Sequence, residues 1–345
     1  MLPMIVNADS LEHLKTLDEN IFDSCVTDPP YHLASIVKRF GPGQKGINNK
    51  DEKEGRNGPY HRAAKGFMGQ TWDGGDIAFQ KEFWEQVYRT IKPGAVLLAF
   101  AATRNYHRMA VAIEDAGFEV FDMINWIYGS GFPKRRNLLK PAHEPIVMAR
   151  KGVNKELNLN ECRVGDFVQD TTKNRRGDES NKEAIYKLGL KKDSPFGVTK
   201  GRYPANVIHD GSEEVIESFP HHTKAGKYKG EGSKSGGIWH KSTGKPAGVE
   251  YGDEGSVARY FYSAKANKKE KGDTKHPTVK PISLMRYLVR LVTPKDGLVL
   301  DPFAGTGTTG EACILEDRNY YLIEKTKEYI PDIEKRLNKY GRLGI

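Results

Sequence analysis

Four consecutive residues, Asp28-Pro29-Pro30-Tyr31, combine groups that could activate an amine. They follow an apolar run, residues 21–27, that predicts a strand, and open α/β sheets bind ligands where their strands end. The two prolines stiffen the turn and lack N–H donors, so carbonyl oxygens point outward without internal partners. If the Asp28 carboxylate and the Pro29 carbonyl accept both N–H groups of an aromatic amine, the nitrogen can direct its lone pair at an electrophile while Tyr31 stacks on the ring. The alternative is a rigid turn that only ends a strand.

A second motif, near the C-terminal end, suits a nucleoside cofactor. Residues 298–300 predict a strand, which is followed by the glycine loop, residues 301–307, with the sequence Asp-Pro-Phe-Ala-Gly-Thr-Gly. Its glycines allow positive φ and a close approach of a ligand to the backbone. Glu324, after the next predicted strand, can accept hydrogen bonds from both hydroxyls of a ribose. The loop lacks the Gly-Lys-Ser/Thr of a P-loop, and its alternative interpretation is a turn that needs small residues.

Together, the two motifs resemble those of the DNA amino-methyltransferases, which transfer a methyl group from S-adenosylmethionine to an exocyclic nitrogen of a base. Their order in the chain, with Asp-Pro-Pro-Tyr first and the glycine loop last, resembles the circularly permuted beta group of this family. Residues 7–10 resemble its acidic element and residues 125–128 its aromatic element beside the target base. Residues 276–281 resemble the segment at the methionine end of the cofactor.

The resemblance implies a role for each matching residue. The target amine would be held by Asp28, Pro29, Pro30 and Tyr31. The cofactor would be bound by residues of several segments: Asp9, Thr278, Lys280, Pro281, Asp301, Phe303, Ala304, Gly305, Thr306, Gly307 and Glu324. Asp9 could instead only cap a helix. Within the family, Asp at the first position goes mostly with adenine and Ser with cytosine, so Asp28 favours N6-adenine; N4-cytosine, or RNA as acceptor, is the alternative.

Double-stranded DNA is the partner that the resemblance implies, and the target base must be extruded from it. Trp126 would lie beside that base, and the cluster Lys134, Arg135 and Arg136 could grip phosphates. A homodimer, a separately encoded restriction endonuclease and a bacterial or phage origin are further expectations from the family. The non-enzymatic alternative is a DNA-binding modulator on the same fold, and the presence of both complete motifs argues against it.

Composition agrees with an anionic partner and excludes other classes. The 345 residues include 54 Lys and Arg against 45 Asp and Glu, a net charge of +9. The sequence contains neither an apolar run of roughly 18 residues nor a signal peptide, so we expect no membrane association. Three distant cysteines exclude a disulfide framework and fit a reducing cytoplasm. His221, His222 and His240 lack the spacing of metal ligands, so no metal site is expected.

The elements that must position these residues alternate along the chain. We expect strands at residues 4–7, 21–27, 95–101, 118–128, 145–149, 298–300 and 320–323. We expect helices at residues 11–17, 77–91, 105–116, 282–292, 306–315 and 325–338, the second stopped by Lys92-Pro93-Gly94. Such alternation predicts a Rossmann-like α/β fold, a mostly parallel sheet with helices on both faces.

The middle of the chain has a different character. Between residues 151 and 270 the apolar periodicity weakens and Gly, Lys, Asn and Ser become frequent. We therefore predict a catalytic domain split into residues 1–150 and 271–345. Residues 151–270 are expected to be an insertion rather than more of the same sheet, and the resemblance implies that this insertion is the target-recognition region. Residues 259–265 are expected to be a strand that returns to the core.

Overall fold

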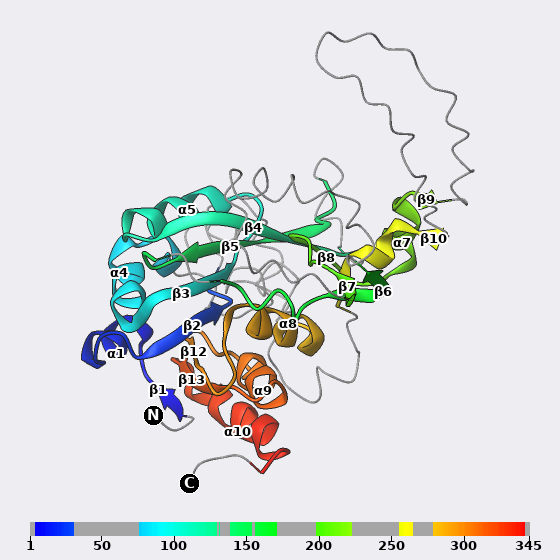
Figure 1. The fold of residues 1–345 in the computed structure, drawn as a ribbon. Helices are drawn as coiled ribbons and strands as arrows, with labels where there is room; N and C mark the ends of the chain where they lie inside the picture. Colours follow the sequence, from blue (N-terminus) through cyan, green and yellow to red (C-terminus); the bar gives the residue numbers. More distant parts are fainter. Residues whose placement is uncertain are drawn as a thin grey trace, which may run out of the picture.

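A nine-stranded sheet forms the centre of the molecule (Figure 1). The computed structural model describes residues 4–30, 76–129, 131, 139–153, 156–170, 198–222, 255–264 and 279–341. In spatial order the strands are β1 (Met4–Asn7), β13 (Asn319–Glu324), β12 (Leu298–Asp301), β2 (Phe22–Thr27), β3 (Ile91–Phe100), β5 (His143–Arg150), β4 (Glu119–Ile127), β8 (Val207–His209) and β11 (Tyr262–Ser263). All neighbours pair in parallel except at β5, which runs antiparallel to β3 and β4. The predicted mostly parallel sheet is confirmed.

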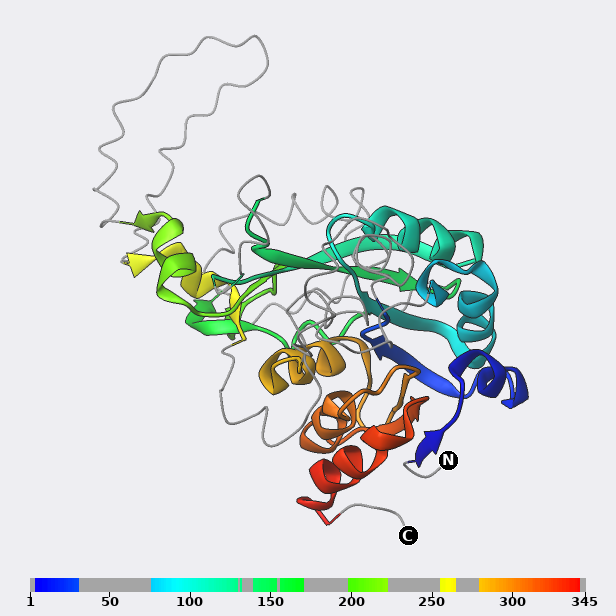
Figure 2. The same cartoon turned by 180° about the vertical axis from the view of Figure 1, so that it is seen from behind.

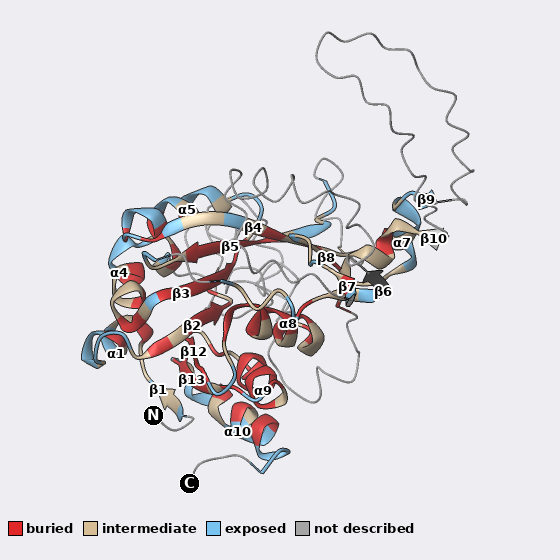
Figure 3. Ribbon diagram, viewed as in Figure 1, coloured by how far each residue is buried: buried red, intermediate tan, exposed pale blue. Residues whose placement is uncertain are grey.

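Helices cover both faces of this sheet, as the two opposite views show (Figures 1 and 2). One face carries α8 (Ile282–Val292), α9 (Thr308–Leu315) and α10 (Ile330–Asn338), and the other carries α1 (Ser10–Thr16), α4 (Lys81–Thr90) and α5 (Tyr106–Asp115). The central strands are buried between them (Figure 3). Along β3, Leu98 and Phe100 pack into one core and Leu97 and Ala99 into the other. Because side chains alternate along a strand, this unbroken apolar run fills both cores.

Most predicted elements lie within a few residues of the observed ones, and α8 has both of its expected ends. Two expected helices are each divided, however, by a short 3-10 turn. Ile77–Phe79 precedes α4, and Lys327–Tyr329 precedes α10. Pro331 accounts for the second division, since proline is tolerated in the first turn of a helix but not in its interior.

The predicted stop at Lys92-Pro93-Gly94 is wrong in detail, because α4 ends at Thr90 and these residues already belong to β3. Gly94 has a φ of +80°, and its N–H donates to the Lys151 carbonyl at 2.7 Å. The register of β2 against β3 shifts between Phe22 and Ser24. The shift lies opposite the part of β3 that contains Pro93, which has no N–H to donate. The segment therefore continues as an irregular strand.

The middle of the chain contributes β8 and β11 to the main sheet. The expectation of an insertion outside this sheet is therefore wrong for β8, whereas β11 lies within the strand expected at residues 259–265. The remaining described elements there are β6 (Val164–Asp170), β7 (Val198–Arg202), α7 (Glu213–Ser218), β9 (His221–His222), β10 (Gly255–Ser256) and a 3-10 turn at Val257–Tyr260. The strand expected at residues 259–265 is reduced to the two residues of β11. Ser256 caps the turn before it, because its Oγ accepts the Ala258 N–H at 3.2 Å.

Within the ranges given above, no helix is long and apolar enough to cross a membrane. The same residues contain no group of three His, Cys, Asp or Glu side chains arranged to hold a metal ion.

Candidate active site

The two sequence motifs meet at the centre of the sheet, where adjacent strands β12 and β2 end. From β12 the chain continues through α9 to β13 on one side, and from β2 it continues through α4 to β3 on the other. This reversal of direction is the position at which open α/β sheets bind ligands. The Thr27 hydroxyl donates to Asp301 Oδ1 at 2.8 Å and so joins the two strand ends.

Asp301 organises the start of the glycine loop. Its Oδ1 also accepts the Phe303 N–H at 3.1 Å, and its Oδ2 accepts the Thr309 hydroxyl at 2.5 Å. Gly305 and Gly307 have φ values of +53° and +77°. The loop therefore turns directly into α9 through two residues in a region that favours glycine.

Gly307→Ala is expected to destabilise the fold by about 2–4 kcal/mol, because the new Cβ would be strained and would lie 2.8 Å from Ile333 Cγ2. Urea unfolding measures the free energy. Gly152→Ala is the matched control, since Gly152 has a φ of +64° but no atom within 4 Å of its Cβ position. We expect it to lose only about 1 kcal/mol. Equal losses in the two variants would contradict the close packing of α9 on α10.

Asp301 should give the fold an unusual pH dependence. Burial raises its pKa from 3.8 to about 6, although the Thr309 and Thr27 hydroxyls oppose the shift. Since the folded protein binds this proton more tightly than the unfolded chain, the contribution of Asp301 to stability falls as pH rises from about 4 to about 6. We expect Asp301→Asn to gain roughly 3 kcal/mol relative to wild type between pH 4 and pH 7. Measuring the free energy of unfolding of both proteins at both pH values cancels any pH-independent cost of the substitution. If the difference between variant and wild type were the same at pH 4 and pH 7, the burial of an ionised carboxylate would be contradicted.

Glu324 lies at the end of β13, next to the glycine loop. Its Oε2 accepts the Gly305 N–H at 2.8 Å and its Oε1 accepts the Thr326 N–H at 2.7 Å. Burial raises its pKa, and these two hydrogen bonds oppose the rise. A carboxylate oxygen has two lone pairs, so each oxygen can accept a further donor. The acid is thus fixed in place while it keeps acceptor capacity for a diol.

The rest of the loop is packed into the protein. Ala304 and Thr306 are buried, and the Phe303 ring lies 5.1 Å from the Phe83 ring of α4. Phe303 itself is only half-buried. The structure therefore brings together all the predicted cofactor residues between 301 and 307.

Asp28 directly follows β2, with Pro29 buried behind it and Pro30 half-buried. Its Oδ2 lies 2.7 Å from Lys280 Nζ. Tyr31, the fourth residue of the motif, lies outside the described residues, and so does Thr278. The described part of the turn places a carboxylate at the same end of the parallel strands as the glycine loop.

Lys280 is expected at the methionine end of a cofactor, and the structure adds a second environment for it. Its ammonium contacts Asp28, lies 3.0 Å from Glu144 Oε2 and lies 4.6 Å from the centre of the Phe100 ring. Burial lowers the pKa of Lys280, but the two carboxylates outweigh burial and hold it above its ordinary value. Pro281, which is buried, precedes α8 and so fixes where this segment meets the core.

Glu144 is the residue that sequence reasoning missed. It is at the start of β5, and because β5 is antiparallel, its start lies where the parallel strands end. Its partner in the register is Trp126. Tyr128, two residues further on, has its pKa raised to about 12 by burial and by the Glu144 charge, which Lys280 partly offsets. The one available signal was an acidic residue at the boundary of an apolar strand.

Two predicted residues have structural roles in the described part of the chain. Asp9 caps α1, since its Oδ1 accepts the Leu11 and Glu12 N–H groups at 3.1 and 3.3 Å, and its Oδ2 pairs with Lys325 at 2.9 Å. The alternative that Asp9 caps a helix is thus confirmed. Trp126 belongs to a core cluster and is only 9% exposed. Its contact with a base stays a prediction. The predicted phosphate contacts Lys134, Arg135 and Arg136 lie outside the described residues.

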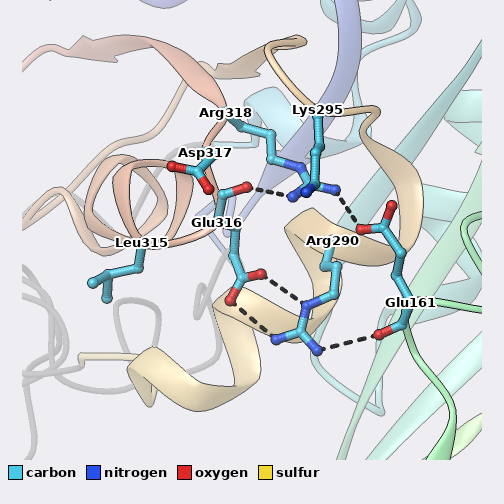
Figure 4. A pocket seen from close by; sticks show the side chains of 7 residues that line it. All are labelled: Glu161, Arg290, Lys295, Leu315, Glu316, Asp317 and Arg318. Atoms are coloured by element: carbon cyan, nitrogen blue, oxygen red, sulfur yellow. Dashed lines mark hydrogen bonds and ion pairs between the residues drawn. The ribbon is translucent and has the colours of Figure 1, made fainter.

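A pocket of about 410 Å³ lies at the opposite end of the parallel strands, where β12 and β13 begin (Figure 4). Arg290 donates to both Glu316 oxygens at 2.8 and 3.0 Å, and Arg318 lies 3.0 Å from Glu161. The pocket is lined by Glu161, Arg290, Lys295, Leu315, Glu316, Asp317 and Arg318. Equal numbers of basic and acidic side chains line it. Their ion pairs form a network that joins α8 to the segment between α9 and β13.

Comparisons with known proteins identify the family to which the chain is similar. A family model described as DNA methylase matches residues 22–335. The chain is 24% identical over 338 residues to the type II methyltransferase M.HindIII of Haemophilus influenzae, covering 94% of this chain and 92% of that protein. It is 49% identical over 67 residues to M2.MboI of Moraxella bovis, a match to 19% of this chain and about a quarter (24%) of that protein.

Two solved structures are similar to the chain as a whole. A complex of M1.HpyAVI with SAM is 18% identical, with a TM-score of 0.48, and the match covers 97% of this chain and 98% of that one. PvuII DNA methyltransferase, described as cytosine-N4-specific, is 18% identical with a TM-score of 0.47, covering 99% and 94%. Both are too distant for a comparison of individual side chains.

Proposed function

This chain belongs to the DNA methylase family, and from that premise we propose that it transfers a methyl group from S-adenosylmethionine to the exocyclic amine of a base at a specific site in double-stranded DNA. The observation that carries the proposal is the hydrogen bond between Thr27 and Asp301. It ties the strand that leads into Asp28 to the strand that leads into the glycine loop. An amine held by Asp28 would therefore lie beside a cofactor held by the loop.

The residues present fit this cofactor. The half-buried Gly305 allows a close approach to the loop backbone, Gly307 lets the loop turn into α9 against Ile333, and Glu324 is a buried carboxylate suited to ribose hydroxyls. Pro281 and Lys280 would lie toward the methionine end, together with Thr278. When bound, S-adenosylmethionine supplies an electrophilic methyl group. The chain supplies the position of that group and a shielded sheet edge around it.

Asp28 and the Pro29 carbonyl would accept the two N–H groups of the target amine. This arrangement favours a tetrahedral nitrogen whose lone pair points at the methyl group, so catalysis is positioning and electrostatics without a covalent enzyme intermediate. Asp at this position favours the N6 amine of adenine. The base would leave the duplex to reach Asp28, and Tyr31 would stack on it.

The test is direct. Purified protein is incubated with S-adenosylmethionine and methylation-free DNA, and the digested nucleosides are separated by mass spectrometry. We expect N6-methyldeoxyadenosine, and long-read sequencing of the same DNA would identify the recognised site. Detection of N4-methyldeoxycytidine would identify cytosine instead of adenine as the acceptor and would leave the proposed methyl transfer unchanged. No methylated nucleoside from an intact protein that binds DNA would favour the non-catalytic modulator and contradict the proposal.

Recognition of DNA is assigned to other parts of the chain. Residues 151–270 would read the target sequence as an insertion between the two catalytic parts, residues 1–150 and 271–345. Lys134, Arg135 and Arg136 would contact phosphates, which fix the register of a protein on the duplex. A homodimer and a separate cognate endonuclease are compatible with this function. Gel filtration and the genes next to this one would test them.

A further inference from the structure

We propose that Glu144 is a positioning residue for the methyl transfer. By sharing the Lys280 ammonium, it leaves the Asp28 carboxylate a net negative charge with which to hold the target amine. The inference rests on the proposed function and extends it to a residue that neither sequence motif contains.

Three charged side chains from three separate segments of the chain meet at this site. Lys280 Nζ lies 2.7 Å from Asp28 Oδ2 and 3.0 Å from Glu144 Oε2. The lysine side chain is 11% exposed, and the two carboxylates are 29% and 22% exposed. The Phe100 ring lies below the ammonium at 4.6 Å, which adds a cation–π contact. The cation is thus held by several partners in a shielded site where electrostatic interactions are strong.

Lys280, Asp28 and Glu144 form a charged cluster. One ammonium stands against two carboxylates, so these three groups taken together contribute a net charge of −1. If Lys280 faced Asp28 alone, the pair would be neutral, and the carboxylate would attract a third, cationic group much less. With Glu144 present, the ammonium has a second carboxylate with which to share its charge. Asp28 can then accept the amine through its lone pairs while Lys280 stays in contact with Oδ2.

Methyl transfer would change the charge on the target nitrogen. The nitrogen lone pair forms the new N–C bond, the C–S bond breaks with its electron pair left on sulfur, and an N–H proton then leaves to water. Positive charge therefore moves from sulfur to the target nitrogen as the bond forms. A negative cluster next to that nitrogen stabilises the transition state more than the neutral amine, and such a difference raises the rate.

Glu144→Gln tests this role, because it removes the charge and keeps the shape. In single-turnover reactions with saturating cofactor and DNA, we expect methyl transfer to slow about 10- to 100-fold. The dissociation constant of S-adenosylmethionine, measured by calorimetry, should change less than about twofold, and Glu144→Asp should give an intermediate rate. Glu119→Gln is the matched control, since this acid is also paired with a cation, Arg150 at 2.6 Å, but at the other end of β4. It should transfer at the wild-type rate.

A wild-type rate for folded Glu144→Gln would overturn the inference. A loss that disappears at higher cofactor concentration would do the same, since Glu144 would then act on cofactor binding. If the glutamine variant does not fold, Glu144→Asp decides, and a wild-type rate in that variant is the contrary result. Failure of the proposed function is a separate outcome, because the wild-type protein itself would then methylate no DNA.

Discussion

Asp28→Ala is expected to slow methyl transfer to DNA by about three orders of magnitude, with little change in the affinity for S-adenosylmethionine. The variant removes the group that would accept an N–H from the target amine. It also removes one of the two carboxylates around Lys280, whose Nζ is 2.7 Å from Asp28 and 3.0 Å from Glu144. Single-turnover transfer and cofactor calorimetry on the same preparation separate the rate from the binding.

Asp23→Ala is the control for this result. Asp23 is on the same strand as Thr27, near its other end, and it also pairs with a lysine, Lys92 at 2.8 Å. It further accepts the Leu298 N–H at 3.0 Å, so its loss should lower stability and leave the rate constant of folded protein unchanged. Transfer near the wild-type rate in Asp28→Ala would contradict the mechanism, and an equal loss in both variants would point to unfolding.

The core of the fold could be predicted because its elements have strong local signals. The apolar run in β3 and the amphipathic pattern of α8 each determine an element without reference to the rest of the chain. The edge of the sheet could not be predicted in this way. β8 is only three residues long and pairs with β4, and the two-residue β11 pairs with β8, so these strands are defined by their neighbours. β11 lies inside the longer strand expected at residues 259–265, and β8 has no comparable local signal.

The same difference separates the parts of the candidate site. Asp301, Gly305 and Gly307 are contiguous, and Glu324 follows one helix and one strand later, so a motif can identify them. Lys280 and Asp28 are 252 residues apart in sequence, and their contact depends on how α8 docks on the sheet. An isolated acid such as Glu144 before a strand is usually an ordinary surface residue. Single-sequence reasoning therefore assigns it no role.

Structural roles explain why some motif positions need not contact a ligand. One Asp9 carboxylate oxygen accepts hydrogen bonds at the N-terminus of α1, and the other pairs with Lys325. The neighbouring Ser10 donates to the Pro302 carbonyl at 2.5 Å and so fastens α1 to the glycine loop. The segment around Asp9 can thus support the cofactor loop through the Ser10 hydrogen bond, without contacting a ligand. A contact between Asp9 and an adenine stays a prediction.

Glu324→Gln is expected to weaken S-adenosylmethionine binding about 100-fold. The wild-type carboxylate uses one oxygen for the Gly305 N–H and the other for the Thr326 N–H, and both oxygens keep lone pairs for ribose hydroxyls. A glutamine has only one such oxygen, so its amide would oppose one backbone N–H group and leave it unsatisfied. The charge that strengthens hydrogen bonds to the ribose is lost as well. Calorimetry with S-adenosylmethionine measures the dissociation constant.

Glu316→Gln is the matched control, because Glu316 is as buried as Glu324, each being 8% exposed, and also accepts hydrogen bonds at both oxygens. It precedes β13, whereas Glu324 ends the same strand, so it belongs to the pocket at the opposite edge of the sheet (Figure 4). Its replacement should lower the free energy of unfolding and leave cofactor affinity unchanged. If both variants weakened binding equally, the effect would come from stability alone and Glu324 would not be the ribose ligand. A loss confined to Glu324→Gln would instead identify the end of β13 as the place where the cofactor is held.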